Sequence, residues 1–152
     1  MQIKRATISD AEEILALQKQ AFHSEAQLHD NFNIPPLVQT LDSIIEDFSK
    51  YEFYKSVLNN RIIGAVKVRL LKNNQLWIGR LVVHPVHQGK GIGRNLMLFI
   101  ETKYAGAAGF ELFTAQKSVR NIKFYEGLGY RIKNTYSEPG HDDIVLVKMI
   151  KN

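Results

Sequence analysis

The chain has 152 residues, of which 45% are hydrophobic and 23% charged, and it carries a net charge of +5 and no cysteine. This composition is typical of a globular domain large enough to bury a core. The absence of cysteine excludes disulfides, thiolate metal sites and a cysteine nucleophile. No apolar run approaches the roughly 20 residues of a spanning helix, and the N-terminus lacks a signal-peptide core. We therefore expect a cytoplasmic protein without membrane contact.

The first third of the chain predicts one strand and two helices. Residues 2–7 alternate in polarity, as a strand does. Ser9 and Glu12 fit a capping box at the start of a helix that runs to about residue 22. The polar segment 23–36 ends in two prolines, which predicts a loop or a broken helix. Apolar residues at helical spacing then predict a second amphipathic helix over 41–48.

A three-stranded meander follows. Two strand-like runs, 53–58 and 61–71, are separated by Asn59 and Asn60, and asparagine tolerates the positive φ of tight hairpin turns. A second turn leads to a third strand at 75–84. After a glycine-rich turn the remaining elements are listed in chain order: a helix to about Tyr104, a strand at 111–115, a short helix at 119–127, and strands at 130–136 and 143–150. We expect one α+β domain, residues 1–152, around one central sheet.

The glycine-rich turn is the most informative stretch. Gly89, Gly91 and Gly93 fall between a strand and a helix. Such a turn presents bare backbone N–H groups, and the helix N-terminus adds partial positive charge, so the site suits an anion such as phosphate. Lys90 and Arg94 add full charges. The P-loop pattern and the dinucleotide-binding pattern G-x-G-x-x-G are both absent.

The stretch Val83-His84-Pro85-Val86-His87-Gln88-Gly89-Lys90-Gly91-Ile92-Gly93 resembles the acyl-CoA-binding motif of the GNAT superfamily of N-acetyltransferases. Gln88, Gly91 and Gly93 fill its Q/R-x-x-G-x-G/A signature, and Val83 and Pro85 fill the V-x-P before it. The element order also matches, so the resemblance covers nearly the whole chain. It implies a mixed α/β fold: a mostly antiparallel, twisted sheet of about seven strands flanked by about four helices.

The resemblance also implies where acetyl-CoA binds as co-substrate. The backbone amides of the turn would hold the pyrophosphate, and the pantetheine arm would lie along the preceding strand. A bulge splays that strand from its neighbour in this family. The implied turn residues are Gln88, Gly89, Lys90, Gly91, Ile92, Gly93 and Arg94, and the implied strand residues are Leu81, Val82 and Val83.

The segment Asn121-Ile122-Lys123-Phe124-Tyr125-Glu126 is similar to the family's N-x-x-F/A-Y segment. By that match Tyr125 protonates the departing sulfur, Asn121 hydrogen-bonds the pantetheine, and Phe124 packs near the cofactor. The alternative for Tyr125 is a core tyrosine whose hydroxyl is satisfied. With no cysteine to carry the acetyl group, direct attack by the amine is favoured over a thiol-linked intermediate.

The general base and the acceptor site are less defined. Many relatives have a glutamate on the strand before the turn, but residues 75–81 hold no carboxylate. The base is left open between a water chain, a residue of 23–36 and one of the 137–143 turn, where His141, Asp142 and Asp143 could rim the pocket. His84 and His87 are interpreted as surface residues. Glu25, His29 and Asp30 are the candidate acceptor residues; with His23 they form no metal-binding spacing, so we expect no metal.

We therefore predict an acetyl-CoA-dependent N-acetyltransferase that modifies a primary amine of a small molecule. One alternative is an enzyme that acetylates protein N-termini or lysines. Another is a non-catalytic module that binds CoA or RNA. Because Lys and Arg are scattered along the chain, we expect no nucleic-acid partner. The oligomeric state stays open, with a homodimer as one option.

Overall fold

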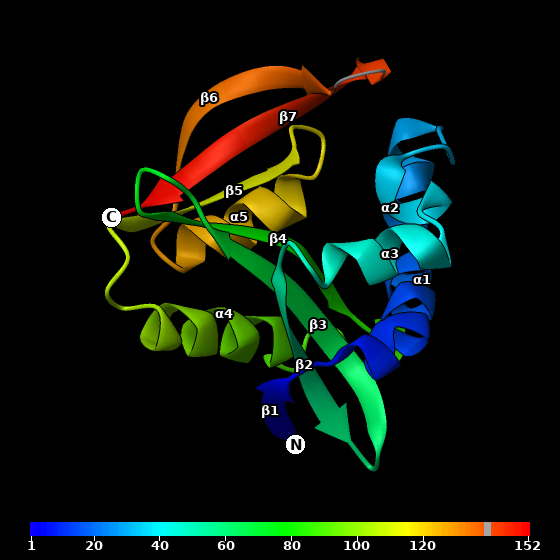
Figure 1. The fold of residues 1–152 in the computed structure, drawn as a ribbon. Coiled ribbons are helices and arrows are strands. Elements are labelled where there is room, and N and C mark those ends of the chain that lie inside the picture. Colours follow the sequence, from blue (N-terminus) through cyan, green and yellow to red (C-terminus); the bar gives the residue numbers. More distant parts are fainter. Residues whose placement is uncertain (139–140) are drawn as a thin grey trace.

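The computed structural model describes residues 1–138 and 141–152, apart from the side chains at 28, 29, 138 and 141–144. Its centre is a seven-stranded sheet in the order β1-β2-β3-β4-β5-β7-β6 (Figure 1). Every neighbouring pair is antiparallel except β4 and β5, which are parallel. The predicted fold class is thereby confirmed. The strands are β1 (Gln2–Arg5), β2 (Glu52–Leu58), β3 (Arg61–Leu70), β4 (Gln75–Val83), β5 (Gly109–Ala115), β6 (Arg131–Glu138) and β7 (His141–Lys151).

Helices cover both faces of the sheet. On one face, apolar residues of the first and third helices pack on Phe53, Ala65 and Val82. On the other, the fourth helix packs on the alternate strand residues, such as Tyr54 and Val66, with the fifth helix beside it. The helices are α1 (Ala11–His29), α2 (Pro35–Val38), α3 (Leu41–Asp47), α4 (Ile92–Lys103) and α5 (Val119–Gly127).

Two local predictions at the first helix are wrong. The capping pair is Thr7 and Asp10 instead of Ser9 and Glu12: the Thr7 backbone N–H donates to Asp10 Oδ2 at 2.9 Å, and a 3-10 turn precedes α1. The helix also continues to His29 instead of ending near residue 22. Ala26 is fully buried against Ile34, so apolar packing carries the helix through a polar stretch. This extension brings Glu25 over the centre of the sheet.

The hairpin turns follow the predicted chemistry. Asn59 and Asn60 both have positive φ, 52° and 62°, and connect β2 to β3. Gly129, with φ of 98°, follows α5 and turns the chain into β6. The Asn-Asn pair was therefore a reliable signal for the position of this hairpin.

A bulge in β4 decides the shape of the centre. Ala65 of β3 lies opposite Val82, whereas Lys67 lies opposite Gly79, so β4 holds one extra residue at Arg80–Leu81. Arg80 has a left-handed φ of 51°, the local kink by which a bulge bends its strand. The parallel pairing of β4 with β5 covers Gln75–Ile78 against Gly109–Leu112. The two strands separate immediately after these pairs, next to the bulge.

Candidate active site

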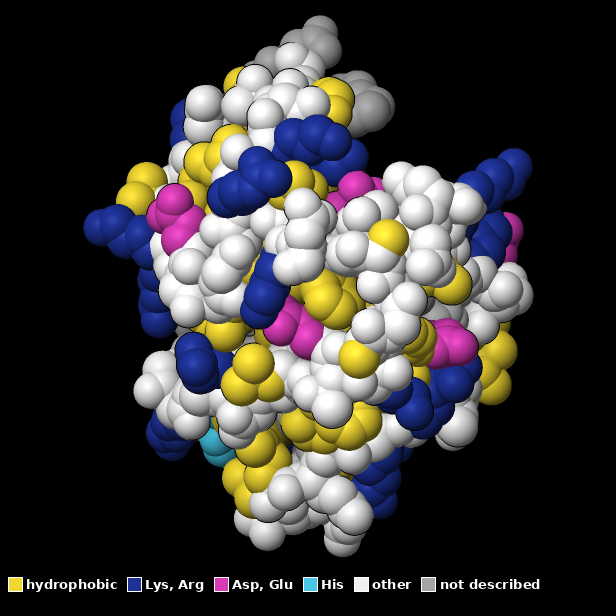
Figure 2. Space-filling view, turned by 90° about the vertical axis from the view of Figure 1, so that its left-hand side faces the viewer, with side chains coloured by type: hydrophobic (Ala, Val, Ile, Leu, Met, Phe, Trp, Pro, Cys, Tyr) yellow, Lys and Arg dark blue, Asp and Glu magenta, His cyan; other side chains and the backbone are white. Residues whose placement is uncertain are grey.

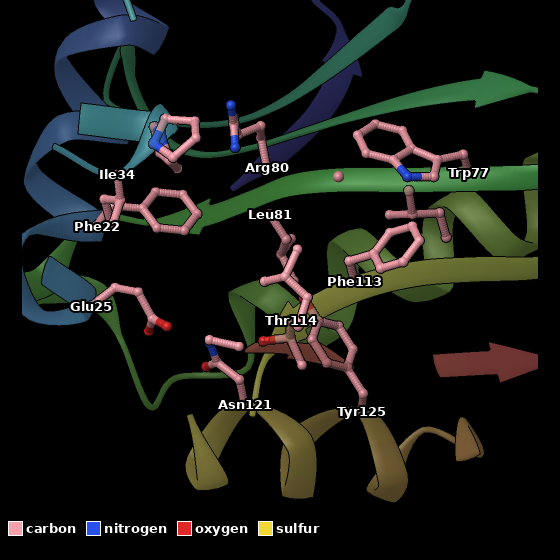
Figure 3. Close-up of a pocket in the computed structure, with 16 residues that line it drawn as sticks. Phe22, Glu25, Ile34, Trp77, Arg80, Leu81, Phe113, Thr114, Asn121 and Tyr125 are labelled. Carbon is pink, nitrogen blue, oxygen red and sulfur yellow. The ribbon is translucent and has the colours of Figure 1, made fainter. Parts of the chain in front are cut away.

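A pocket of about 420 Å³ lies where β4 and β5 separate. Its walls come from both faces of the sheet. Phe22 and Glu25 of α1 form one wall, and Asn121 and Tyr125 of α5 form another, with Glu25 beside Asn121 (Figure 3). The pocket therefore passes through the split in the sheet. Its volume lies in the range of small-molecule sites.

The glycine-rich turn opens beside this split. Gly89 and Gly91 have positive φ, 77° and 84°, and a Cβ built on either would meet nothing within 4 Å. Gly91 is the N-cap of α4, and Gln88 to Gly91 are exposed. The turn is thus an open backbone cradle at a helix N-terminus, which suits a phosphate group.

Side-chain contacts hold the turn against β4. Gln88 Nε2 donates to the backbone oxygen of Val83 at 3.1 Å, and His84 Nδ1 accepts from the Val86 N–H at 3.2 Å. A Cβ on Gly93 would lie 3.5 Å from Phe124 and 3.6 Å from Val83. Residues that the sequence separates by some thirty positions therefore meet at the start of α4.

Tyr125 lines the pocket from α5. Its ring makes edge contacts with Phe124, at 5.1 Å between centroids, and with Tyr130, at 6.0 Å. Burial raises the pKa of its hydroxyl well above the usual 10. Tyr125 therefore stays protonated at neutral pH, as a proton donor must. Asn121 lies one turn earlier on the same helix and is exposed toward the pocket.

The predicted acceptor residues do not form one cluster. Glu25 lines the pocket and accepts a short hydrogen bond from Ser118 Oγ at the start of α5. Asp30 is exposed and ends α1 with a left-handed φ of 50°. The side chain of His29, and those of His141, Asp142 and Asp143, lie outside the described residues. Among the described residues that line the pocket, Glu25 is the one carboxylate.

A polar network beside the pocket was not predicted from the sequence. Lys67 of β3 is bound to Asp47 of α3 at 3.2 Å, and their side chains are only 7% and 16% exposed. Burial lowers the pKa of Lys67, the nearby Arg80 lowers it further, and Asp47 opposes both. Gln39 donates to the same Asp47 Oδ2 at 2.7 Å. The network ties α3 to the sheet near the bulge.

Sequence reasoning also missed the aromatic lining. Trp77 and Phe113 line the pocket on the face that α1 and α3 cover (Figure 3), as do Phe22 and Arg80. Trp77 and Gly79 are two residues apart on β4, and Gly79 lies opposite Lys67 of β3. A period-two pattern could therefore have placed Trp77 on the same face as Lys67. Only the bulge brings that face to the split. The cofactor candidates Leu81, Val82 and Val83 do lie on β4 at this point, although the Val82 side chain is buried under α1.

Several negative observations concern the described residues only. There, no three His, Asp or Glu side chains gather as a metal site, and no helix is long and apolar enough to cross a membrane. On one face of the molecule, Lys and Arg side chains are spread among hydrophobic and acidic ones (Figure 2). This face offers no continuous basic track.

Comparisons with known proteins agree with this geometry. Residues 49–132 match the family described as Acetyltransferase (GNAT) domain. The UPF0157 protein YqkA of Bacillus subtilis (strain 168) is 33% identical over 136 residues, which cover 89% of this chain. The chain spans 38% of the length of that curated relative.

Solved structures share the fold at low identity. The protein smu.2055 from Streptococcus mutans UA159 has a TM-score of 0.83 at 19% identity, covering 100% of this chain and 99% of that one. An aminoglycoside 6'-N-acetyltransferase complexed with coenzyme A has a TM-score of 0.73 at 15% identity, covering 99% and 96%. At these identities the likeness is one of fold.

Proposed function

Because the chain belongs to the GNAT acetyltransferase family, we propose that it transfers the acetyl group of acetyl-CoA to a primary amine of a small-molecule acceptor. One observation carries the proposal. The open glycine cradle at the start of α4 adjoins the split between β4 and β5, and the split leads to a pocket that contains Tyr125. A turn that suits phosphate, the opening between β4 and β5, and a tyrosine hydroxyl thereby adjoin one another.

The residues of this chain fit the co-substrate. The backbone from Gln88 to Arg94 holds the pyrophosphate, because Gly89 and Gly91 leave the N–H groups uncovered. The β4 backbone at Leu81 to Val83 lies beyond the last residue paired with β5, and it binds the pantetheine arm as a strand neighbour would. Phe124 packs at the start of α4 beside this arm. Asn121 supplies an amide at the pocket wall.

The proposed reaction is a direct transfer. A bond forms between the amine nitrogen and the acetyl carbon, and the carbon–sulfur bond of the thioester breaks. The amine loses one proton and the sulfur gains one. Tyr125 gives the proton to the sulfur, since burial keeps its hydroxyl neutral. Glu25 attracts the ammonium form of the acceptor and takes its first proton through water, and the proton that the nitrogen loses after attack returns Tyr125 to its neutral form.

The aminoglycoside enzyme of the same fold is named for a small amine-bearing substrate. The pocket here is bounded by α1 and α2 at one end, which supports a small acceptor over a long polypeptide. The test is to incubate the protein and acetyl-CoA with a panel of amines, polyamines, amino acids and peptides. Acetyl transfer is measured as the release of the free thiol of CoA. Because the chain holds no cysteine, a thiol reagent responds to CoA alone. Thiol release with peptides but with no small amine would overturn the assignment.

A further inference from the structure

The single tryptophan of the chain lies flat along β4. A Cβ built on Gly79 would come within 2.0 Å of the Trp77 ring, and two further ring atoms would lie within 2.7 Å. Gly79 is therefore required so that the indole can cover the strand next to the bulge. The indole ring occupies the space above Gly79 that a side chain would fill at another strand position.

Neighbours fix the ring in this position. The Tyr51 ring lies 5.4 Å from it, tilted by 45°. Lys67 Nζ lies 4.2 Å from the Tyr51 centroid and 5.8 Å from the Trp77 centroid, within the range of cation–π attraction. Because Asp47 anchors Lys67, the indole is held before any ligand arrives. A preorganised surface loses little entropy on binding.

A second ring stands across the split. Trp77 of β4 lies opposite Glu111 of β5, and Phe113 follows Glu111 by two residues, so both rings project from the same face of the sheet. Phe113 is 39% exposed, and the Tyr136 ring lies 5.7 Å from it at an angle of 65°. Large apolar side chains so exposed at the rim of a pocket mark a binding surface.

We propose that the acceptor amine carries an aromatic ring, which stacks on Trp77 beside Phe113. This inference rests on the proposed function and names its substrate class. A flat ring matches the flat indole and loses water on both faces. The far wall adds apolar side chains from Phe22, Ile34 and Pro36, with Arg80 and Glu25 as the charged groups of the described lining. An acceptor without a ring leaves the Trp77 and Phe113 rings in contact with water.

The first test is direct binding, read from Trp77 fluorescence of the full chain saturated with CoA. The chain has one tryptophan, so the emission reports this site alone. We expect 2-phenylethylamine to change the emission at about tenfold lower concentration than n-butylamine, since a well-stacked aromatic pair contributes up to about 1.4 kcal/mol beyond burial, which is tenfold in affinity. Equal half-saturation by the two amines, or no response to either, would overturn the inference.

The second test is acetyl transfer to the same two amines. Trp77→Leu keeps an apolar side chain without the ring, and Gly79→Ala forces the ring away while keeping tryptophan. Each variant should lower the ratio of kcat/KM for 2-phenylethylamine to that for n-butylamine about tenfold. Phe99→Leu removes a ring from α4, where it packs on Tyr54, and should preserve the preference. A preference that survives in both variants contradicts the inference.

Failure of the proposed function has a different signature. In that case no amine of any kind releases thiol, although the fluorescence test still decides whether the aromatic surface binds rings. If n-butylamine and 2-phenylethylamine are acetylated equally well, the transferase is confirmed and the aromatic acceptor is wrong.

Discussion

At the scale of single residues, Tyr125 illustrates how surroundings define a role. The hydroxyl comes from a helix whose other side chains pack against the α4 core. No hydrogen bond to the hydroxyl occurs among the described residues, and burial raises its pKa. The interpretation of Tyr125 as a proton donor stays a prediction.

Replacing Tyr125 by phenylalanine should lower kcat by about 100- to 10,000-fold and change the affinity for CoA little. Because the pKa of Tyr125 is raised above 10, tyrosine ionisation should not reduce the wild-type kcat below about pH 10. The measurement is kcat against pH for both proteins with one acceptor. Tyr104→Phe, which removes a hydroxyl bound to Glu52, is the control. Wild-type kcat in Tyr125→Phe would show that the hydroxyl is structural.

At the scale of elements, two connections position the site: the turn from β4 to α4 and the bond from α3 to β3. The turn depends on Gly91, whose left-handed conformation places the helix N-terminus toward the open cradle. The second connection depends on a buried ion pair between Asp47 and Lys67. The turn follows the end of β4, and Lys67 lies opposite Gly79, next to the bulge.

Gly91→Glu should weaken CoA binding by about tenfold or more, because a carboxylate then opposes phosphate at the helix N-terminus. Two controls separate charge from other effects. Gly91→Asn adds a neutral side chain that tolerates the left-handed conformation. Gly106→Glu adds the same charge at another open glycine. Calorimetry with CoA gives the affinities, and an unchanged affinity in folded Gly91→Glu would contradict the phosphate assignment.

The two halves of the buried ion pair should respond unequally to mutation. Asp47→Ala leaves Lys67 buried without its carboxylate and beside Arg80, so we expect a loss of about 3 kcal/mol in the free energy of unfolding. Lys67→Met keeps an apolar chain of similar length and should cost much less. Adding Lys67→Met to Asp47→Ala should recover most of the loss. Urea unfolding measures all three, and equal losses for the single variants would refute the explanation.

At the scale of the whole molecule, the sheet builds the site by opening between β4 and β5. Helices on opposite faces then contribute to one pocket: α1 and α2 from one side and α5 from the other. Ser118 and Glu25 join these helices across the opening. The same arrangement buries tyrosines around α4, which gives the fold a sensitivity to alkaline pH.

Burial raises the pKa of Tyr54 to about 12, with Glu52 adding to the effect. It also raises the pKa of Tyr125, and that of Tyr130 together with Glu101. Above pH 10 the unfolded chain releases these protons while the folded chain keeps them, so the unfolded state is favoured. The free energy of unfolding should fall above pH 10 by about 1.4 kcal/mol per pH unit for each such tyrosine.

Tyr130→Phe should make this decline less steep, whereas Tyr136→Phe, at an exposed position, should not. Chemical unfolding at a series of pH values above 9 would measure the slopes. Stability that stays constant up to pH 12 would mean that these hydroxyls ionise as easily in the folded chain as in the unfolded one.

The sequence by itself determined the elements and the turn chemistry. Hydrophobic periodicity located the meander and α3, the Asn59–Asn60 pair located a hairpin, and the spacing of Gly89 and Gly91 located the open turn before α4. These features depend on neighbours within a few positions, where local sterics and backbone hydrogen bonds dominate. The predicted end of α1 was wrong because the helix continues through Ala26, which packs on Ile34 beyond the helix.

Only the tertiary structure decided where the chemistry meets. The extra residue at Arg80–Leu81 has no sequence signature, because a bulge is a mismatch between two strands and belongs to neither alone. That mismatch bends β4 where it parts from β5, beside the exposed Phe113 ring, and Glu25 there meets Ser118 from 93 positions away. Such contacts join residues far apart in the sequence, and closing the long loops between them costs entropy. Only the pairing of the whole sheet offsets that cost.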